Sequence, residues 1–382
     1  MNVLIAPDSF KGSLSSKEVS NAIEKGFKKV LPQSNTKKVP IADGGEGTVE
    51  SVIESAGGRI YRVVVHDPLM RRISSFFGIL DDGKTAVIEM AAASGIGLLR
   101  REEQDPWYTT SYGTGELIKA ALDRKCSTII LGIGGSATND AGAGMLSALG
   151  AKLTDKTGSV IKPGGGFLSE ISSIDVSDLD KRINNTKMLV ACDVNNPLTG
   201  ESGSSFVYGP QKGADKDMIL KLDNNLKHFA SLVKKIHGRD IETIPGSGAA
   251  GGIGGGLLGF LDAELMPGFE LISQVIKLEK FIKDSHLVIT GEGKIDNQTI
   301  YGKAPAGILK LAKKYNIPVI AVTGQLESGS DELYEMGFQV IMPIVDKPMN
   351  LEEAFKSASF LLEDTGERIA RFVQLTKLIP AD

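Results

Sequence analysis

Hydrophobic and polar positions follow one another in a recurring order of short apolar run, polar loop and amphipathic segment. Residues 3–6 form an apolar run that leads to Asp8, and residues 15–18 match a capping box with Ser15 at the N-cap. Apolar side chains at positions 19, 22, 23, 27 and 30 then keep helical spacing until Pro32. Strand, loop and helix in this order predict a parallel βα unit.

The same order recurs along the chain and predicts a parallel sheet of about six strands covered by helices. The expected strands are residues 3–6, 38–42, 128–133, 287–290, 319–322 and 340–344, and the expected helices after them begin near residues 15, 48, 141, 305, 331 and 351. This pattern is typical of an α/β fold with a Rossmann-like or flavodoxin-like sheet.

Two stretches depart from this order and predict a second, discontinuous α/β domain inserted into the first. Residues 59–93 contain three β-prone runs joined by short turns, which indicates hairpins, and residues 151–284 are irregular and rich in glycine. We therefore expect a Rossmann-like domain of residues 1–58, 110–150 and 285–382. The inserted domain, with a mixed sheet, would take residues 59–109 and 151–284, with the active site in the cleft between the two.

Composition and charge argue against several classes of function. The chain has 382 residues and a formal net charge of -4, without a Lys/Arg cluster, which argues against a nucleic-acid partner. The two cysteines have no metal-ligand spacing, and no signal peptide is evident at the N-terminus. The charge-free residues 244–261 carry too many glycines for a membrane span. We expect a cytoplasmic protein that acts on small molecules.

Two segments match nucleotide-binding motifs formally, and their context argues against both. Residues 78–85 have Walker A spacing, but residues 85–90 are β-prone where a P-loop must open a helix, so we interpret Gly83 as a hairpin turn. Residues 246–251 have dinucleotide-fingerprint spacing after a weak strand that ends at Pro245. We interpret these glycines as a ligand-contacting loop, with close helix packing as the alternative.

Four loops place acidic residues and glycines where an apolar strand ends, the edge at which open α/β sheets bind ligands. For any one loop, a tight connection with capping residues is an equal alternative, but four together favour a ligand site. The loops are residues 8–13 (DSFKGS), 43–48 (DGGEGT), 132–140 (GIGGSATND) and 290–296 (TGEGKID). Asp193 also follows an expected strand, and Lys212 lies in a later loop, where an Asx turn and a solvated lysine are the alternatives.

These segments resemble the blocks of the bacterial type I glycerate kinase family, in the same order. Further matching blocks are residues 6–13 (APDSFKGS), 110–116 (TSYGTGE), 192–198 (CDVNNPL) and 209–214 (GPQKGA). One departure is Met70, which stands where the family pattern has glycine, while Asp67, Pro68, Leu69 and Arg71 match.

The resemblance implies ATP-dependent phosphorylation of D-glycerate, with 2-phosphoglycerate favoured over 3-phosphoglycerate and Mg²⁺ as cofactor. It also implies roles for individual residues. The catalytic group would comprise Asp193, Lys11 and Asp8, with Asp193 facing the substrate hydroxyl; Ser9, Lys11, Arg71 and Lys212 would bind glycerate; Gly134, Gly135, Ser136, Asn139, Gly291 and Lys294 would bind ATP; and Asp43, Asp140 and Glu292 would bind the metal.

Two other functions remain alternatives at this stage. A sugar-acid or nucleotide-binding regulator on the same fold would bind without turnover, and a nicotinamide dehydrogenase would use residues 246–251. A homodimer is compatible with the sequence, which does not decide the phosphorylated hydroxyl or the enantiomer.

Overall fold

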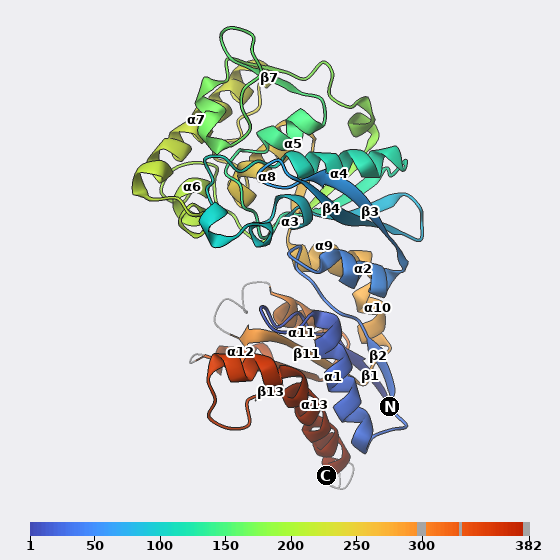
Figure 1. Ribbon diagram of the computed structural model, residues 1–382. Helices are drawn as coiled ribbons and strands as arrows, with labels where there is room; N and C mark the ends of the chain where they lie inside the picture. The colour runs from blue at the N-terminus through green and yellow to red at the C-terminus, as the bar shows by residue number, and fades with distance from the viewer. Residues whose placement is uncertain (296–302, 328–330, 377–382) are drawn as a thin grey trace. The chain divides into compact units, whose positions relative to one another are not determined.

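The computed structural model describes residues 1–295, 303–327 and 331–376 (Figure 1). The chain divides into two compact units. Unit 1 comprises Met1–Asp43, Glu50–Ala56 and Phe269–Asp382, and unit 2 comprises Gly44–Val49 and Gly57–Gly268. The α/β class predicted from the sequence is confirmed, because both units are built on sheets with parallel strands and flanking helices.

Unit 1 is built on a five-stranded parallel sheet. Its strand order is β13 (Val340–Pro343), β12 (Val319–Leu326), β11 (Leu287–Ile295), β1 (Asn2–Ile5) and β2 (Asn35–Lys38). The helices of this part of the chain are α1 (Ser16–Val30), α2 (Thr48–Ala56), α9 (Gly268–Val275), α10 (Leu278–Lys283), α11 (Ala304–Lys313), α12 (Asp331–Met336) and α13 (Leu351–Thr376). Apolar residues of β1, β11 and β12 are buried against α1 and α13 and form the core.

The order of strands in unit 1 reverses between β1 and β11. From β1 the chain continues to β2 on one side, and β11, β12 and β13 follow on the other side. A crevice forms outside the carboxyl ends of the strands at such a switch point, and open α/β sheets bind their ligands there. Asp8 follows β1 and Glu292 lies in β11, so both belong to this edge.

Helices α1 and α13 pack closely, and glycine permits the approach. A Cβ at Gly26 would lie 1.7 Å from the carbonyl oxygen of Glu363, and a Cβ at Gly366 would lie 2.3 Å from that of Ile23. Lys25 adds an ion pair with Glu363 at 2.7 Å. The capping box predicted at Ser15 is confirmed, with α1 running from Ser16 to Val30.

Unit 2 is built on a mixed six-stranded sheet. Its order is β10 (Glu264–Met266), β9 (Lys187–Ala191), β6 (Thr128–Gly132), β5 (Thr85–Glu89), β4 (Arg72–Leu80) and β3 (Gly58–His66), parallel from β10 to β5 and antiparallel from β5 to β3. The other elements are α3 (Ala91–Ser94), α4 (Tyr112–Asp123), α5 (Ala143–Ala148), α6 (Ser204–Tyr208), α7 (Lys216–His237), α8 (Ala249–Phe260) and the β7 (Lys152–Thr154)–β8 (Ser173–Asp175) pair.

The predicted domain boundaries were wrong for residues 110–150. These residues belong to unit 2, because β6 pairs with β5 on one side and β9 on the other. Unit 1 therefore has five described strands instead of about six. The strand expected at residues 38–42 ends at Lys38 in the structure, and residues 39–42 continue beside β1 as a buried extended segment.

The structure decides both formal nucleotide motifs. Residues 78–85 lie in the β4–β5 hairpin, with Gly83 in its turn, which confirms the hairpin interpretation. Our preference for a ligand-contacting loop at residues 246–251 was wrong. Gly246, Gly248 and Gly251 are buried, and a Cβ at Gly251 would lie 1.8 Å from the carbonyl oxygen of Thr138. These glycines allow the start of α8 to pack on the β6–α5 loop.

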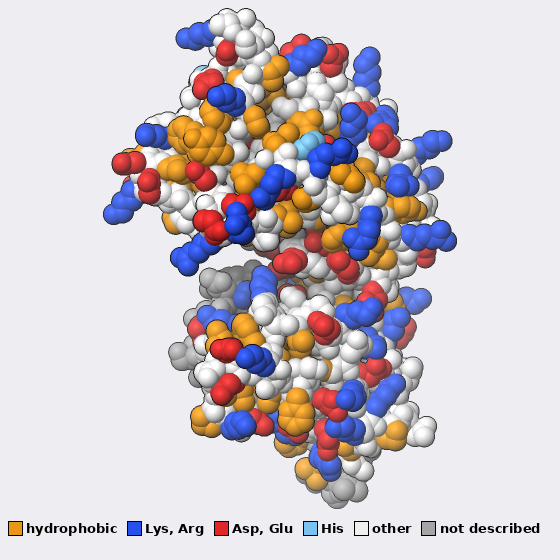
Figure 2. Space-filling view, in the orientation of Figure 1, with side chains coloured by type: hydrophobic (Ala, Val, Ile, Leu, Met, Phe, Trp, Pro, Cys, Tyr) orange, Lys and Arg blue, Asp and Glu red, His pale blue; other side chains and the backbone are white. Residues whose placement is uncertain are grey.

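Within the described residues, no helix is long and apolar enough to cross a membrane. On the face shown in Figure 2, the described Lys and Arg side chains are interspersed with Asp and Glu, so that face has no continuous basic patch.

Candidate functional site

A cavity of about 450 Å³ lies at the carboxyl edge of the unit 1 sheet. Its charged lining combines three carboxylates with three ammonium groups from the loop after β1, the segment after β2, the end of β11 and the start of α11. These residues are Asp8, Lys11, Asp43, Glu292, Lys294 and Lys303. The structure therefore brings three of the four predicted strand-end loops into contact with one cavity.

Asp8 is held by the backbone at the switch point. Its amide donates to the carbonyl of Gly291 at 2.8 Å, and its Oδ1 accepts from the amide of Ser9 at 2.6 Å. Burial, followed by the negative charge of Asp43, raises the pKa of the Asp8 carboxyl to about 7. Lys11 opposes this shift of the pKa. The Asp8 side chain can therefore exchange a proton near neutral pH.

Two lysines of the cavity are oriented by acidic neighbours. Lys303 Nζ lies 3.3 Å from Glu292 Oε2, and Lys294 Nζ lies 2.8 Å from Glu327 Oε1. Lys303 is also the N-cap residue of α11, whose first turn contains Pro305. Two ammonium groups beside the amino end of a helix suit the phosphates of a nucleotide.

The carboxylates of the cavity are suitable ligands for a Mg²⁺ ion that is bound to a nucleotide. Within the described residues, no three His, Cys, Asp or Glu side chains converge to form a complete metal site. Mg²⁺ usually keeps several waters and binds one or two carboxylates together with substrate phosphates. Asp43 and Glu292 supply that number of hard oxygen ligands. Asp296, the other carboxylate of the TGEGKID segment, lies outside the described residues.

Asp140, predicted as a metal ligand, holds the β6–α5 loop of unit 2 together. Its carboxylate is fully buried and accepts hydrogen bonds from the amides of Ser111, Gly142 and Gly144 and from the Ser111 hydroxyl. Burial raises the pKa of this carboxyl, and the hydrogen bonds act in the opposite direction. This bonding pattern supports a structural role for Asp140, whereas Asp43 and Glu292 line the cavity.

Lys212, predicted as an anion contact, is inserted into the same loop. Its Nζ donates to Ser136 Oγ and to the carbonyl of Thr138, each at 2.7 Å, and the residue is 2% exposed. Burial lowers the pKa of the Lys212 ammonium to about 7, and the charge of Asp140 opposes this shift. In this arrangement Lys212 supports the loop instead of offering its charge to a substrate.

The predicted ATP-binding residues of this loop divide into two groups. Gly134 and Gly135 are exposed, whereas Ser136 and Asn139 are buried and hydrogen-bonded to Lys212 and Ser205. Gly291 serves strand pairing in unit 1, since a Cβ there would lie 2.2 Å from the carbonyl of Val322. Of the four predicted residues in this loop, the two exposed glycines keep a free surface for a ligand.

The remaining predicted residues are exposed in unit 2. Asp193 follows β9, and its Oδ1 accepts from the amide of Gly268 at 2.7 Å, at the start of α9. Arg71 lies between β3 and β4, where Nη1 donates to Glu103 Oε1 at 2.8 Å and Nε donates to Asp67. The neighbouring Met70 has φ 62, the left-handed conformation that glycine adopts most easily.

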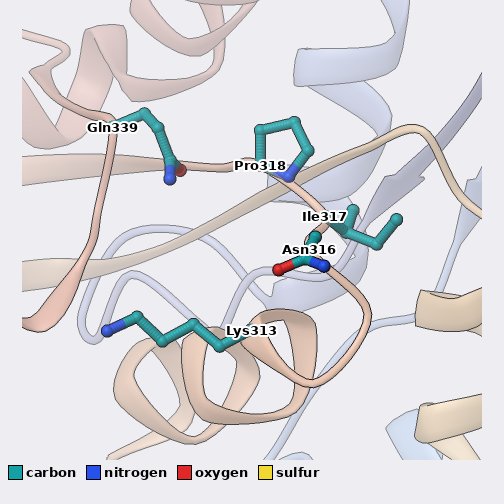
Figure 3. Close-up of a pocket in the computed structure, with 5 residues that line it drawn as sticks. All are labelled: Lys313, Asn316, Ile317, Pro318 and Gln339. Carbon is teal, nitrogen blue, oxygen red and sulfur yellow. The ribbon is translucent and has the colours of Figure 1, made fainter.

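A second cavity, of about 240 Å³, lies at the opposite edge of the unit 1 sheet, where Pro318 and Gln339 precede β12 and β13 (Figure 3). Lys313 is the one charged residue among those that line it. Gln339 Oε1 already accepts from the amide of Val319 at 2.7 Å. The residues that line this smaller cavity include no carboxylate, unlike those of the larger cavity.

Comparisons with known proteins assign the chain to a family. The glycerate kinase family model matches residues 3–374. The chain belongs to the glycerate kinase family. It is 50% identical to a glycerate kinase of Bacillus subtilis, with 99% of each chain covered, and 50% identical to a glycerate 2-kinase of Escherichia coli, with 94% of each covered. A crystal structure from Salmonella typhimurium LT2 that carries the name glycerate kinase 2 has a TM-score of 0.89 and 46% identity, over 99% of this chain and 100% of that one.

Membership in this family makes the chain a phosphotransferase with an alcohol group as acceptor. Two features of the larger cavity are absent from the sequence prediction. They are Lys303 and the wall formed by the segment between β13 and α13 together with the start of α13. The signal for Lys303 was its place two residues before Pro305, at the expected start of a helix.

Proposed function

We propose that this family member transfers the γ-phosphoryl group of ATP to the 2-hydroxyl of D-glycerate, with Mg²⁺ as cofactor. The observation that carries the proposal is the set of carboxylates and ammonium groups in one cavity at the switch point of a parallel sheet. The choice of the 2-hydroxyl is supported by the 50% identity to a relative named glycerate 2-kinase.

Ser9, Lys11 and Asp8 suit the small substrate. Lys11 would bind the glycerate carboxylate by its charge, and Ser9 would donate a hydrogen bond to the same anion. Asp8, in the same segment, would face the hydroxyl and accept its proton. All three come from the segment after β1, so one backbone connection fixes their spacing.

Lys294 and Lys303 suit the phosphates of ATP, and Asp43 and Glu292 suit Mg²⁺. The metal would neutralise charge that develops on the transferred group. The glycerate oxygen would form a bond to the γ-phosphorus while the bond from that phosphorus to the bridging oxygen breaks. The electron pair of the broken bond would leave with ADP, and the hydroxyl proton would pass to Asp8 and then to solvent.

Asp193 of unit 2 remains a second candidate for the carboxylate that faces the hydroxyl. Its position after β9 matches the family block CDVNNPL, and its carboxylate is exposed. Separate mutation of Asp8 and Asp193 distinguishes the two candidates.

A coupled assay tests the reaction itself. Purified protein with ATP, Mg²⁺ and D-glycerate should release ADP, and ³¹P NMR of the product should show 2-phosphoglycerate. Failure to release ADP above background would remove the kinase proposal and leave a binding regulator. A 3-phosphoglycerate signal would correct the position of phosphorylation alone.

Asp8→Asn tests the site. We expect kcat/KM to fall about 10²- to 10⁴-fold because the proton acceptor is lost. The same change should leave the fold intact or stabilise it, since it removes one of the mutually repelling carboxylates of the cavity. Asp284→Asn, an exposed acid elsewhere in unit 1, is the matched control and should keep full activity. Equal activity of both variants would exclude Asp8 from the reaction.

We also propose a cytoplasmic location, where ATP is available. Cys126 and Cys192 are free thiols, as expected of a reducing compartment. A homodimer stays a prediction that gel filtration with light scattering would test.

A further inference from the structure

One wall of the unit 1 cavity is apolar and has no role in the reaction described above. Leu351, Ala354, Phe355 and Ala358 of α13 line the cavity at the spacing of one helical face. Ile344, Val345 and Met349, from the segment between β13 and α13, continue the same wall. Leu351 is 68% exposed and Phe355 is 41% exposed, so large apolar groups face an open volume.

The apolar wall is joined directly to the charged end of the cavity. Ser13 Oγ donates to the carbonyl of Phe355 at 3.1 Å. Gly12 has φ +78, and a Cβ built there would lie 3.2 Å from Cε2 of Phe355, so the ring rests against the backbone of the loop that carries Asp8 and Lys11. A ligand that fills the cavity therefore meets both the aromatic surface of Phe355 and the ammonium groups of the lining.

We infer that this wall binds the base of the nucleotide, so that Phe355, Leu351 and Met349 determine the affinity for the nucleoside part of ATP. The inference rests on the proposed function and names the subsite that holds the base. A nucleoside triphosphate has one flat, weakly polar end and one strongly anionic end, which matches the apolar and charged parts of the cavity lining. Glycerate has three carbons, each bearing an oxygen, and offers no surface of this kind.

The opposite orientation, with phosphates at the start of α13, is disfavoured by the capping of that helix. Asn350 Oδ1 accepts from the amide of Glu353, and Glu353 Oε2 accepts from the amide of Asn350. This capping box uses amides that a phosphate would need, and Glu352 and Glu353 place two negative charges in the first turn. The anionic end of the ligand belongs with Lys294 and Lys303.

A protein segment is a poor occupant of the same space. One turn of an α-helix with its side chains fills roughly 500 Å³, from a diameter of 10–12 Å and a pitch of 5.4 Å. The whole cavity measures about 450 Å³, and its charged residues would have to be buried as well. Small-ligand sites span roughly 300–1,000 Å³, so a nucleotide suits the volume.

Binding of two probes to the purified protein tests the inference without turnover. Isothermal titration calorimetry would compare ADP with inorganic tripolyphosphate, which has the anionic part and no base. Phe355→Ala should raise the Kd of ADP about tenfold, the effect typical of losing one aromatic contact to a base, and leave tripolyphosphate unchanged. Phe360→Ala is the matched control, since Phe360 is on the same helix, is 68% exposed and does not line the cavity.

Leu351→Ser provides a second variant at a more exposed position, in case Phe355→Ala does not fold. It should also weaken ADP selectively. The inference is overturned if wild-type protein does not bind ADP, if neither wall variant changes the Kd of ADP, or if both probes weaken equally. Selective weakening of ADP with no phosphoglycerate formed by the wild type would uphold the base subsite and refute the proposed function.

Discussion

The buried ammonium of Lys212 makes a quantitative prediction about stability and pH. Lys212→Met keeps a side chain of similar length and removes the charge together with its hydrogen bonds to Ser136 and Thr138. The lost packing and hydrogen bonds change the free energy of unfolding by nearly the same amount at every pH. The quantity to measure is therefore the pH dependence of the difference in this free energy between wild type and variant.

The magnitude follows from the two pKa values of the lysine. The pKa of Lys212 is about 7 in the folded protein, against 10.5 for an unperturbed lysine. Between pH 7 and pH 9 the unfolded chain therefore binds more protons than the folded chain, and stability rises with pH in this window. If the unfolded chain held one more proton than the folded chain across all two pH units, the free energy of unfolding would rise by about 2.7 kcal/mol. Because Lys212 is still partly protonated in the folded protein near pH 7, the expected rise is about 2 kcal/mol.

Urea denaturation followed by the fluorescence of the single tryptophan, Trp107, measures this change at pH 7 and pH 9. Relative to Lys212→Met, wild type should gain about 2 kcal/mol at the higher pH. Lys216→Met, at the exposed first residue of α7, is the control and should follow wild type. Parallel pH dependence of wild type and Lys212→Met would refute a neutralised, buried lysine.

Three further substitutions test other features. Asp193→Asn retains an oxygen for the Gly268 amide, so stability should stay within about 0.5 kcal/mol while kcat falls at least about 100-fold if the charge is catalytic; wild-type turnover would exclude that role. Met70→Gly should stabilise the protein by about 0.5–1 kcal/mol in thermal denaturation, because φ is 62 and the side chain is 37% exposed. Lys84→Ala, in the β4–β5 hairpin, should leave the KM for ATP unchanged, and a large increase would revive the Walker A interpretation.

Local features of the fold could be predicted from the sequence because neighbouring residues determine them. The capping box at Ser15 and the end of α1 before Pro32 depend on contacts within a few positions. The membership of residues 110–150 could not be predicted in this way. Strand β6 is an apolar run like those of unit 1. The sheet to which it belongs depends on pairing with segments far apart in sequence, which a local pattern does not reveal.

The candidate site shows the same division. The acids and glycines at strand ends indicated a ligand site, and Asp8, Asp43 and Glu292 do line one cavity. The burial of Lys212 depends on Ser136, 76 residues away, and no local pattern distinguishes such a lysine from a solvated one. The apolar face of α13 becomes informative only when its position beside Lys11 and Lys303 is known.

The pairing of β1 with β11 has a consequence for synthesis on the ribosome. The first strand of the chain is an interior strand of its sheet, and one of its two partners lies 284 residues downstream, as the contact from Thr290 to Ala6 illustrates. Translation of that interval takes roughly 15–60 s at 5–20 residues per second. Unit 2, nearly continuous from Gly44 to Gly268, can fold in that time, while the apolar strand β1 has β2 beside it and lacks β11. The nascent chain therefore leaves one edge of β1 unpaired until its last third emerges, which raises the risk of aggregation during synthesis.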